Sequence, residues 1–334
     1  MPSHPPRAHW LDHIVAFASG RRRLFMHGWG DEAVLARLAT VARFEEPPSA
    51  ITLDWSPPRR EGAVEVSDGT FLSPIADLPQ EARRAHVRRL LPAKLRRGER
   101  PLPMYVVLAA SSDEGFRART WLWRPLIERG AFGVLMLENA MYGLRRPKGQ
   151  KGPSIRTVSD HLLMNASMVE EGRALLDWLA AEGHTRLGVA GFSMGGSMAA
   201  LVAAVTPRPL AAAILAAGRS ASPVFTEGLL ARGIDFEALG EGSGGVVGAR
   251  ERLGKLFAVA DLERHPVPRR PDATLLVAGR RDGYVFPAQA EALHRLWPGS
   301  ELRWAASGHA GALLANAPAL RKAATDAMER LSRG

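Results

Sequence analysis

From residue 104 onward, continuous apolar runs alternate with segments of helical spacing, and this alternation restricts the fold more than any other feature. The runs at 104–109 (MYVVLA) and 132–137 (FGVLML) have the unbroken apolar character of strands covered on both faces. Further strands are predicted at 186–190, 210–217, 274–279 and 301–305, and helices at 120–130, 159–183, 194–205, 287–297 and 310–331. Strands joined by crossover helices predict an α/β fold, a mostly parallel sheet with helices on both faces.

Two segments depart from this pattern, one before residue 104 and one within the alternating part of the chain. Residues 63–66 and 70–72 alternate around Ser67-Asp68-Gly69, which predicts a β-hairpin with an Asp-Gly turn. Residues 219–272 are irregular, and their apolar side chains predict a small cap over a site. Within that segment, residues 240–245 spell G-x-G-x-x-G. No buried strand precedes this motif, so we expect a loop between cap helices instead of a dinucleotide site.

Composition excludes several kinds of site. The chain has no cysteine, which rules out disulfides, thiolate nucleophiles and Cys-bearing zinc sites. The net charge is +10, but the arginines are scattered over residues 21–23, 83–97, 145–151 and 269–270. This distribution favours a basic surface over a nucleic-acid site. No His/Asp/Glu spacing indicates a metal, and we expect neither a metal nor another cofactor.

The turn after the predicted strand 186–190 carries a candidate nucleophile. It reads Gly191-Phe192-Ser193-Met194-Gly195, a G-x-S-x-G between a strand and a helix. A serine at the tip of so tight a turn has strained backbone angles, and its neighbours two positions away must lack side chains. The small residues of the following helix would let it lie close to the sheet. The motif therefore predicts a serine whose hydroxyl is presented at the carboxyl edge of the sheet.

A serine nucleophile needs a base, and the base needs a carboxylate that orients it. Asp282 follows the predicted strand 274–279, and His309 follows the predicted strand 301–305. Because parallel strands end at one edge, we expect both side chains beside Ser193, in the order nucleophile, acid, base. Weaker candidates for the base are His265 and His294, and for the acid Asp261 and Glu263.

An oxyanion hole is predicted from two backbone N–H groups. One belongs to Met194, the residue after the nucleophile. The other comes from the loop after the strand 104–109, where Ser111 is the first candidate and Ala110 the second. This loop also contains Ser112. Glu138 and Asn139 end the next strand at the same edge and could line the pocket, but we expect them to support the turn toward Tyr142-Gly143.

Segments along most of the chain resemble the α/β-hydrolase-domain-containing protein 18 family. They are residues 24–30 (LFMHGWG), 68–74 (DGTFLSP), 137–139 (LEN), 142–143 (YG), 146–148 (RPK), 158–160 (VSD), 193–196 (SMGG), 220–222 (SAS), 224–226 (VFT), 297–299 (WPG) and 308–309 (GH). The resemblance implies the α/β-hydrolase fold and a serine hydrolase with the same triad positions. It also implies that residues 1–100 are an N-terminal extension with the first strands, packed on a core of residues 101–334. The chain differs from the family at Ala110 and Ser112, where members tend to have glycine.

These residues predict a serine hydrolase that cleaves a carboxylic ester through an acyl-enzyme. The apolar cap favours an apolar or lipid acyl substrate. A thioesterase, an acyltransferase or a peptidase would use the same triad, and a non-catalytic binding protein on this fold stays open as well. The polar, Pro-rich N-terminus and the lack of a long apolar stretch predict a cytoplasmic protein. Peripheral membrane contact and the oligomeric state are left open, and no nucleic-acid partner is expected.

Overall fold

The computed structural model describes residues 8–20, 23–38, 44, 46–94 and 101–333. Its strands are β1 (Asp54–Trp55), β2 (Arg59–Glu61), β3 (Val64–Leu72), β4 (Arg84–Pro92), β5 (Met104–Leu108), β6 (Gly133–Leu137), β7 (Leu187–Phe192), β8 (Ala211–Leu215), β9 (Thr274–Gly279) and β10 (Glu301–Ala305). They form one sheet in the order β1-β3-β4-β6-β5-β7-β8-β9-β10, with β2 paired to β3. The strands from β5 to β10 pair in parallel, so the predicted α/β fold with a mostly parallel sheet is confirmed.

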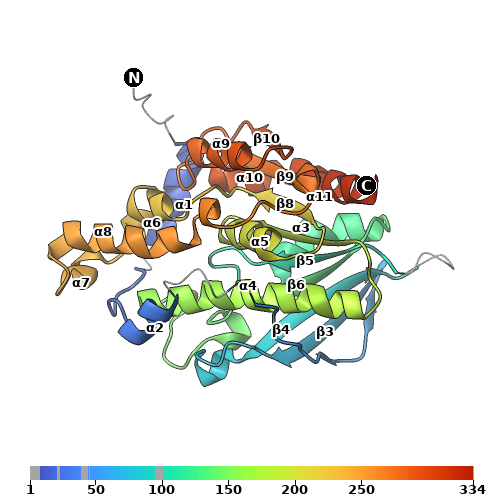
Figure 1. Ribbon diagram of the computed structural model, residues 1–334, viewed down its shortest axis with the longest axis horizontal. Coiled ribbons are helices and arrows are strands. Elements are labelled where there is room, and N and C mark those ends of the chain that lie inside the picture. The colour runs from blue at the N-terminus through green and yellow to red at the C-terminus, as the bar shows by residue number, and fades with distance from the viewer. Residues whose placement is uncertain (1–7, 21–22, 39–43, 45, 95–100, 334) are drawn as a thin grey trace.

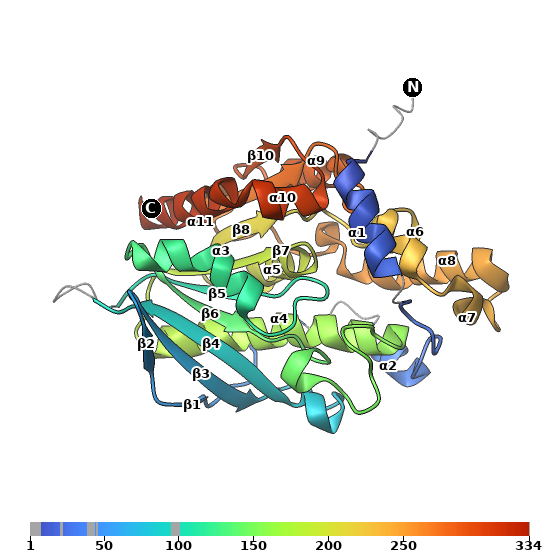
Figure 2. The same ribbon diagram turned by 180° about the vertical axis from the view of Figure 1, so that it is seen from behind.

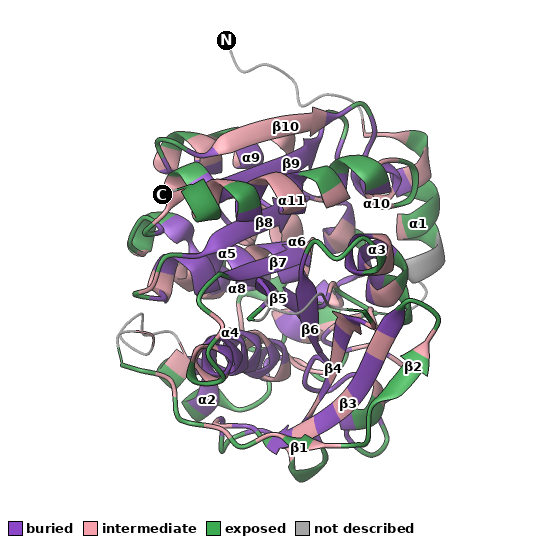
Figure 3. Cartoon of the chain, turned by 90° about the vertical axis from the view of Figure 1, so that its right-hand side faces the viewer, coloured by how far each residue is buried: buried purple, intermediate pink, exposed green. Residues whose placement is uncertain are grey.

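Helices cover both faces of the sheet (Figures 1 and 2). One face packs against α4 (Val158–Ala181), α5 (Met194–Val205) and α9 (Pro287–Leu296). The other packs against α3 (Arg117–Glu128) and α11 (Ala317–Arg333). Every residue of β5, β6, β8 and β9 is buried, as expected for strands covered on two sides, whereas the exposed edge lies at β1 and β2 (Figure 3).

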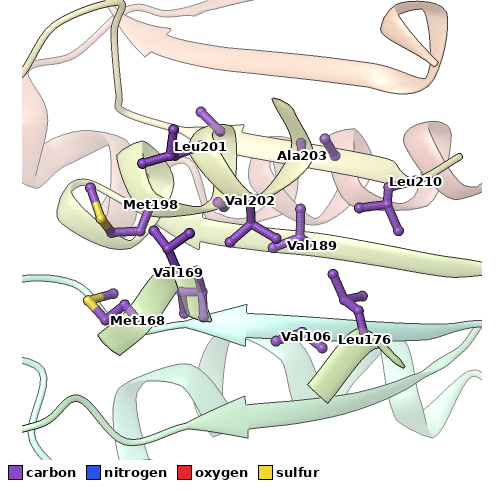
Figure 4. Packing of buried hydrophobic residues seen from close by; sticks show 14 of the residues in the cluster. Val106, Met168, Val169, Leu176, Val189, Met198, Leu201, Val202, Ala203 and Leu210 are labelled. Atoms are coloured by element: carbon purple, nitrogen blue, oxygen red, sulfur yellow. The ribbon is translucent and has the colours of Figure 1, made fainter. Parts of the chain in front are cut away.

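The helix after the nucleophile turn lies close to the sheet because its residues are small. Ala199 and Ala200 on α5 are fully buried, and a Cβ on Gly196 would lie only 2.6 Å from the carbonyl oxygen of Leu215. Figure 4 shows side chains of α4 and α5 meeting Val106 of β5 and Val189 of β7. Tight packing of this kind fixes where the N-terminus of α5 sits relative to the strand ends.

The predicted hairpin at residues 67–69 is wrong. Residues 64–72 form the single strand β3, which pairs antiparallel with β4 over its whole length. Gly69 lies opposite Trp55 of β1, and a Cβ there would come within 2.7 Å of the Trp55 ring. The glycine therefore makes room for an aromatic side chain and does not mark a turn.

The predicted last helix is in fact two helices. The first is α10 (His309–Ala315), and α11 begins at Ala317. Pro318 lies in the first turn of α11, where the missing N–H of proline is tolerated. In one continuous helix this proline could not donate the hydrogen bond to the carbonyl oxygen of residue 314, so the helix breaks before it. The break leaves His309 as the first residue of a short helix of its own.

The N-terminal segment packs against the residues that follow β8. It contains α1 (Trp10–Gly20) and α2 (Glu32–Leu38). Residues 219–272 form α6 (Ser222–Thr226), α7 (Phe236–Gly240), α8 (Gly245–Phe257) and the 3-10 helices η4 (Leu229–Gly233), η5 (Ala258–Ala260), η6 (Leu262–Arg264) and η7 (Pro271–Ala273). Phe25 and Trp29 share a core with Phe225 and Phe236. The G-x-G-x-x-G motif lies between α7 and α8, with no strand before it.

One arginine of the predicted basic surface is buried. Arg145, in the 3-10 helix η3 (Gly143–Arg145), is 0% exposed. It forms a bidentate ion pair with Glu171 of α4, at 2.8 and 2.6 Å, and donates to the carbonyl oxygens of Ala82, in η2 (Gln80–Ala82), and Glu138. The guanidinium therefore ties three segments together inside the fold. Among the described helices, none is both long and apolar enough to cross a membrane.

Candidate active site

Ser193 occupies the turn between β7 and α5 with φ 56° and ψ −122°. A positive φ is costly for a serine and persists only where the surroundings impose it. Gly191 and Gly195 make this turn possible: a Cβ on Gly191 would collide with the carbonyl oxygen of Gly195, and a Cβ on Gly195 would lie 2.5 Å from the carbonyl oxygen of Leu108. Both glycines of the sequence motif are thus sterically required for this turn.

The structure brings Ser193, His309 and Asp282 together in one chain of hydrogen bonds. The Nδ1 atom of His309 lies 2.7 Å from Oδ2 of Asp282, and its Nε2 atom lies 2.8 Å from the Ser193 Oγ. The other carboxylate oxygen of Asp282 accepts the backbone N–H groups of Tyr284 and Val285, both at 2.8 Å. With Nδ1–H donating to the carboxylate, Nε2 is left to accept the serine proton.

The environment of His309 favours its protonated form. Burial is the largest single influence and lowers the pKa, but the charge and hydrogen bond of Asp282, together with the charge of Asp12, outweigh it. The pKa of His309 therefore lies above the ordinary histidine value. An imidazole so placed holds a proton firmly once it has taken one, as a general base must during attack.

The predicted oxyanion residues border the same cavity as Ser193. Met194 begins α5, and Ala110 and Ser111 lie in the loop after β5. Ser112, in this loop, has φ 64°, a left-handed conformation that glycine adopts without strain. Glu138 accepts the N–H of Gly115 at 2.9 Å, so its carboxylate supports this loop. The donation of N–H groups to an oxyanion stays a prediction.

A cavity of about 890 Å³ opens beside Ser193 and His309. Its walls are mostly apolar and come from several elements: the ends of β5 and β8, α3, α10 and the segment 219–272. Ala221, Val224, Phe225 and Leu230 supply the part from that segment. A cavity of this size accommodates a small organic substrate together with an apolar chain.

Asp12, on α1, is a residue of the site that sequence reasoning missed. Its side chain is 0% exposed. Oδ2 accepts the backbone N–H groups of Gly283 and His309 at 3.0 and 2.8 Å, and Oδ1 accepts that of Ala310 at 3.0 Å. One carboxylate therefore joins the turn that carries Asp282 to the turn that carries His309. The sequence gives little signal for this role, because an acidic residue in the first turn of a helix is common.

The strand order, the serine turn and the acid and base at successive strand ends define an α/β-hydrolase-fold protein. The chain belongs to the family described as alpha/beta hydrolase domain containing 18, whose model matches residues 22–246 and 246–330. The predicted family is thereby confirmed.

Solved structures share the fold at low sequence identity. An acetyl xylan esterase from Paenibacillus sp. R4 is 15% identical with a TM-score of 0.53, covering 91% of this chain and 97% of that one. A brefeldin A esterase, a bacterial homologue of human hormone sensitive lipase, is 15% identical with a TM-score of 0.51, covering 97% and 93%. A lipase in its open form is 14% identical with a TM-score of 0.52, covering 80% and 100%. These likenesses show the fold.

Proposed function

We propose that this protein is a serine hydrolase that cleaves carboxylic esters through an acyl-enzyme formed on Ser193. The observation that carries the proposal is the unbroken chain of hydrogen bonds from the Asp282 carboxylate through His309 to the Ser193 hydroxyl, at the wall of an apolar cavity. Ser193 is the nucleophile, His309 the general base and Asp282 the group that orients the imidazole.

The reaction proceeds in two halves. His309 Nε2 takes the Ser193 proton as the oxygen attacks the ester carbonyl, and the tetrahedral oxyanion accepts N–H groups from Met194 and from the loop of Ala110 and Ser111. Collapse of this intermediate breaks the bond to the alcohol, which receives the proton from the imidazolium. A water molecule, deprotonated by the same imidazole, then attacks the acyl carbonyl. The bond between the acyl carbon and the Ser193 Oγ breaks, the imidazolium returns its proton to Oγ, and the acid is released.

An apolar acyl group, such as that of a lipid, is the substrate class that the cavity favours. Its lining includes Val107, Leu108 and Leu215 at the strand ends and Val224 and Phe225 of α6. Burying a methylene group in such surroundings is worth about 0.8 kcal/mol. Each added methylene should therefore raise kcat/KM by up to a few fold, until the cavity is filled.

The proposal is tested by covalent labelling and by a substrate panel. A fluorophosphonate probe should label the wild type and the control Ser332→Ala, on α11, but not Ser193→Ala. The panel contains p-nitrophenyl esters of graded chain length, acyl-CoA and peptides, which separates an esterase from a thioesterase, an acyltransferase or a peptidase. Equal labelling of wild type and Ser193→Ala would remove Ser193 from the chemistry.

A further inference from the structure

Two polar side chains line the same cavity from α4, a helix that contributes nothing to the triad. His161 and Asn165 are four residues apart, so they lie one turn above the other on the same face of the helix. His161 is 3% exposed. Among the residues that the structure describes, neither ring nitrogen of His161 nor the Oδ1 atom of Asn165 has a hydrogen-bond partner.

The surroundings of His161 are aromatic. Its ring lies 5.0 Å from that of Phe225, 5.3 Å from that of Phe257 and 5.8 Å from that of Phe25, measured between ring centres. Burial in this apolar environment lowers the pKa of His161 to about 3, so the imidazole is neutral at physiological pH. A neutral imidazole has one N–H donor and one acceptor nitrogen, and the Asn165 amide adds another acceptor.

A buried polar group without a partner destabilises the fold, and a leucine at the same place would not. Two such groups on one helix face, both bordering the substrate cavity, are explained if the partner arrives with the substrate. A charged ligand group is a poor match, because a neutral imidazole and a neutral amide cannot balance its charge. A neutral hydroxyl fits both side chains, because its oxygen can accept the imidazole N–H while its O–H donates to Oδ1 of Asn165.

We propose that His161 and Asn165 form a polar subsite that binds a neutral hydroxyl oxygen within the otherwise apolar part of the substrate. The inference rests on the proposed function, since the subsite borders the cavity that contains Ser193. It narrows the substrate class from apolar esters in general to esters whose apolar part carries one such oxygen.

The experiment compares matched pairs of fatty acyl p-nitrophenyl esters, plain and hydroxylated, with the hydroxyl moved along the chain. At one position the wild type should prefer the hydroxylated ester by about tenfold in kcat/KM, the discrimination expected of a buried hydrogen bond. His161→Leu and Asn165→Leu should each bring the ratio of kcat/KM for the hydroxylated ester to that for the plain ester close to one, whatever the absolute rate of the variant. His161→Gln, which restores a donor and an acceptor, should recover part of the preference.

His265 provides a matched control. It is also a partly buried histidine beside a phenylalanine, with an Nε2 atom that lacks a partner in the described structure, but it does not line the cavity. His265→Leu should leave the preference intact. No preference in the wild type at any hydroxyl position, or an unchanged preference in His161→Leu and Asn165→Leu, would overturn the subsite.

Binding separates this inference from the proposed function. Calorimetry on Ser193→Ala with the corresponding plain and hydroxylated methyl esters needs no catalysis. If Ser193→Ala binds the hydroxylated ester more tightly than the plain ester, and this difference disappears when His161→Leu is added, the subsite is supported even if the wild type hydrolyses no ester. Hydrolysis by the wild type with equal binding of both esters would retain the proposed function and refute the subsite.

Discussion

Replacing Asp12 by asparagine tests whether α1 positions the triad. The side-chain oxygen of asparagine can keep the place of Oδ2 and still accept the N–H groups of Gly283 and His309. Its NH2 group then faces the N–H of Ala310, donor against donor, where Oδ1 accepted before. One buried hydrogen bond to a charged group is lost, which costs about 1 to 3 kcal/mol of the free energy of unfolding.

The same substitution removes a negative charge near the imidazole. The titratable and polar groups that face His309 are Asp282, the Tyr284 phenol, the Ser193 hydroxyl and Asp12. Because Asp12 stabilises the imidazolium, Asp12→Asn should lower the pKa of His309. We expect kcat to fall by roughly tenfold, since the acid and base turns are no longer tied as firmly, while KM changes little.

The assay combines thermal unfolding with the pH profile of kcat/KM for a p-nitrophenyl ester. The acidic limb of the profile should move to lower pH in Asp12→Asn, a change that a purely structural residue would not cause. Asp31→Asn is the matched control, because Asp31 also accepts two backbone N–H groups at a helix start, at 2.8 and 3.1 Å, but away from the triad. An unmoved limb together with unchanged stability would refute the positioning role.

Three further predictions concern the triad and the buried ion pair. The activity of the wild type should rise as the pH increases through the pKa of His309, because only the neutral imidazole can accept the serine proton. The acidic limb of the kcat/KM profile should therefore lie above about pH 6.5, the ordinary histidine value. An acidic limb well below that pH would contradict the electrostatics of the site. Asp282→Asn should lower kcat by about ten-thousandfold by favouring the wrong tautomer, with the fold intact by circular dichroism; a loss of only a few fold would mean that another group orients the imidazole. Arg145→Met should destabilise the protein by roughly 3 to 5 kcal/mol in urea unfolding, because Glu171 is left buried without its partner. The double variant Arg145→Met/Glu171→Met should recover much of this loss. No recovery would show that lost packing, and not the unpaired charge, causes the destabilisation.

Much of the fold could be predicted because its strands are short, apolar and buried on two sides. The predicted bounds of β9, β10 and α5 match the structure residue for residue. The three triad positions also follow from the sequence, since each comes directly after a strand of one parallel sheet and such strands end at one edge. The local sequence motifs, together with the rule that parallel strands end at one edge of the sheet, therefore predict that Ser193, Asp282 and His309 lie close together.

What the sequence did not reveal depends on contacts between distant segments. Gly69 resembles a turn residue until Trp55 is found packed over it. Arg145 lies in a stretch of basic residues that indicates a surface, yet its partner, Glu171, lies 26 residues further along the chain, on α4. His161 occupies an ordinary apolar position of α4, and only the folded chain shows a cavity beside it. The hydrophobic periodicity of a sequence predicts which face of a helix or strand is buried, but not which residues of other segments contact that face.

The N-terminal helix shows how this limit bears on function. The family model begins at residue 22, so α1 precedes the matched part of the chain. Nevertheless α1 provides Asp12, which joins the turns that carry Asp282 and His309, and Val15, which lines the same cavity as Ser193. A parallel sheet delivers the acid and the base to one edge but leaves each on a separate loop. Because loops are the least rigid part of such a fold, a buried carboxylate that bonds to both is a direct way to hold the imidazole within reach of the serine.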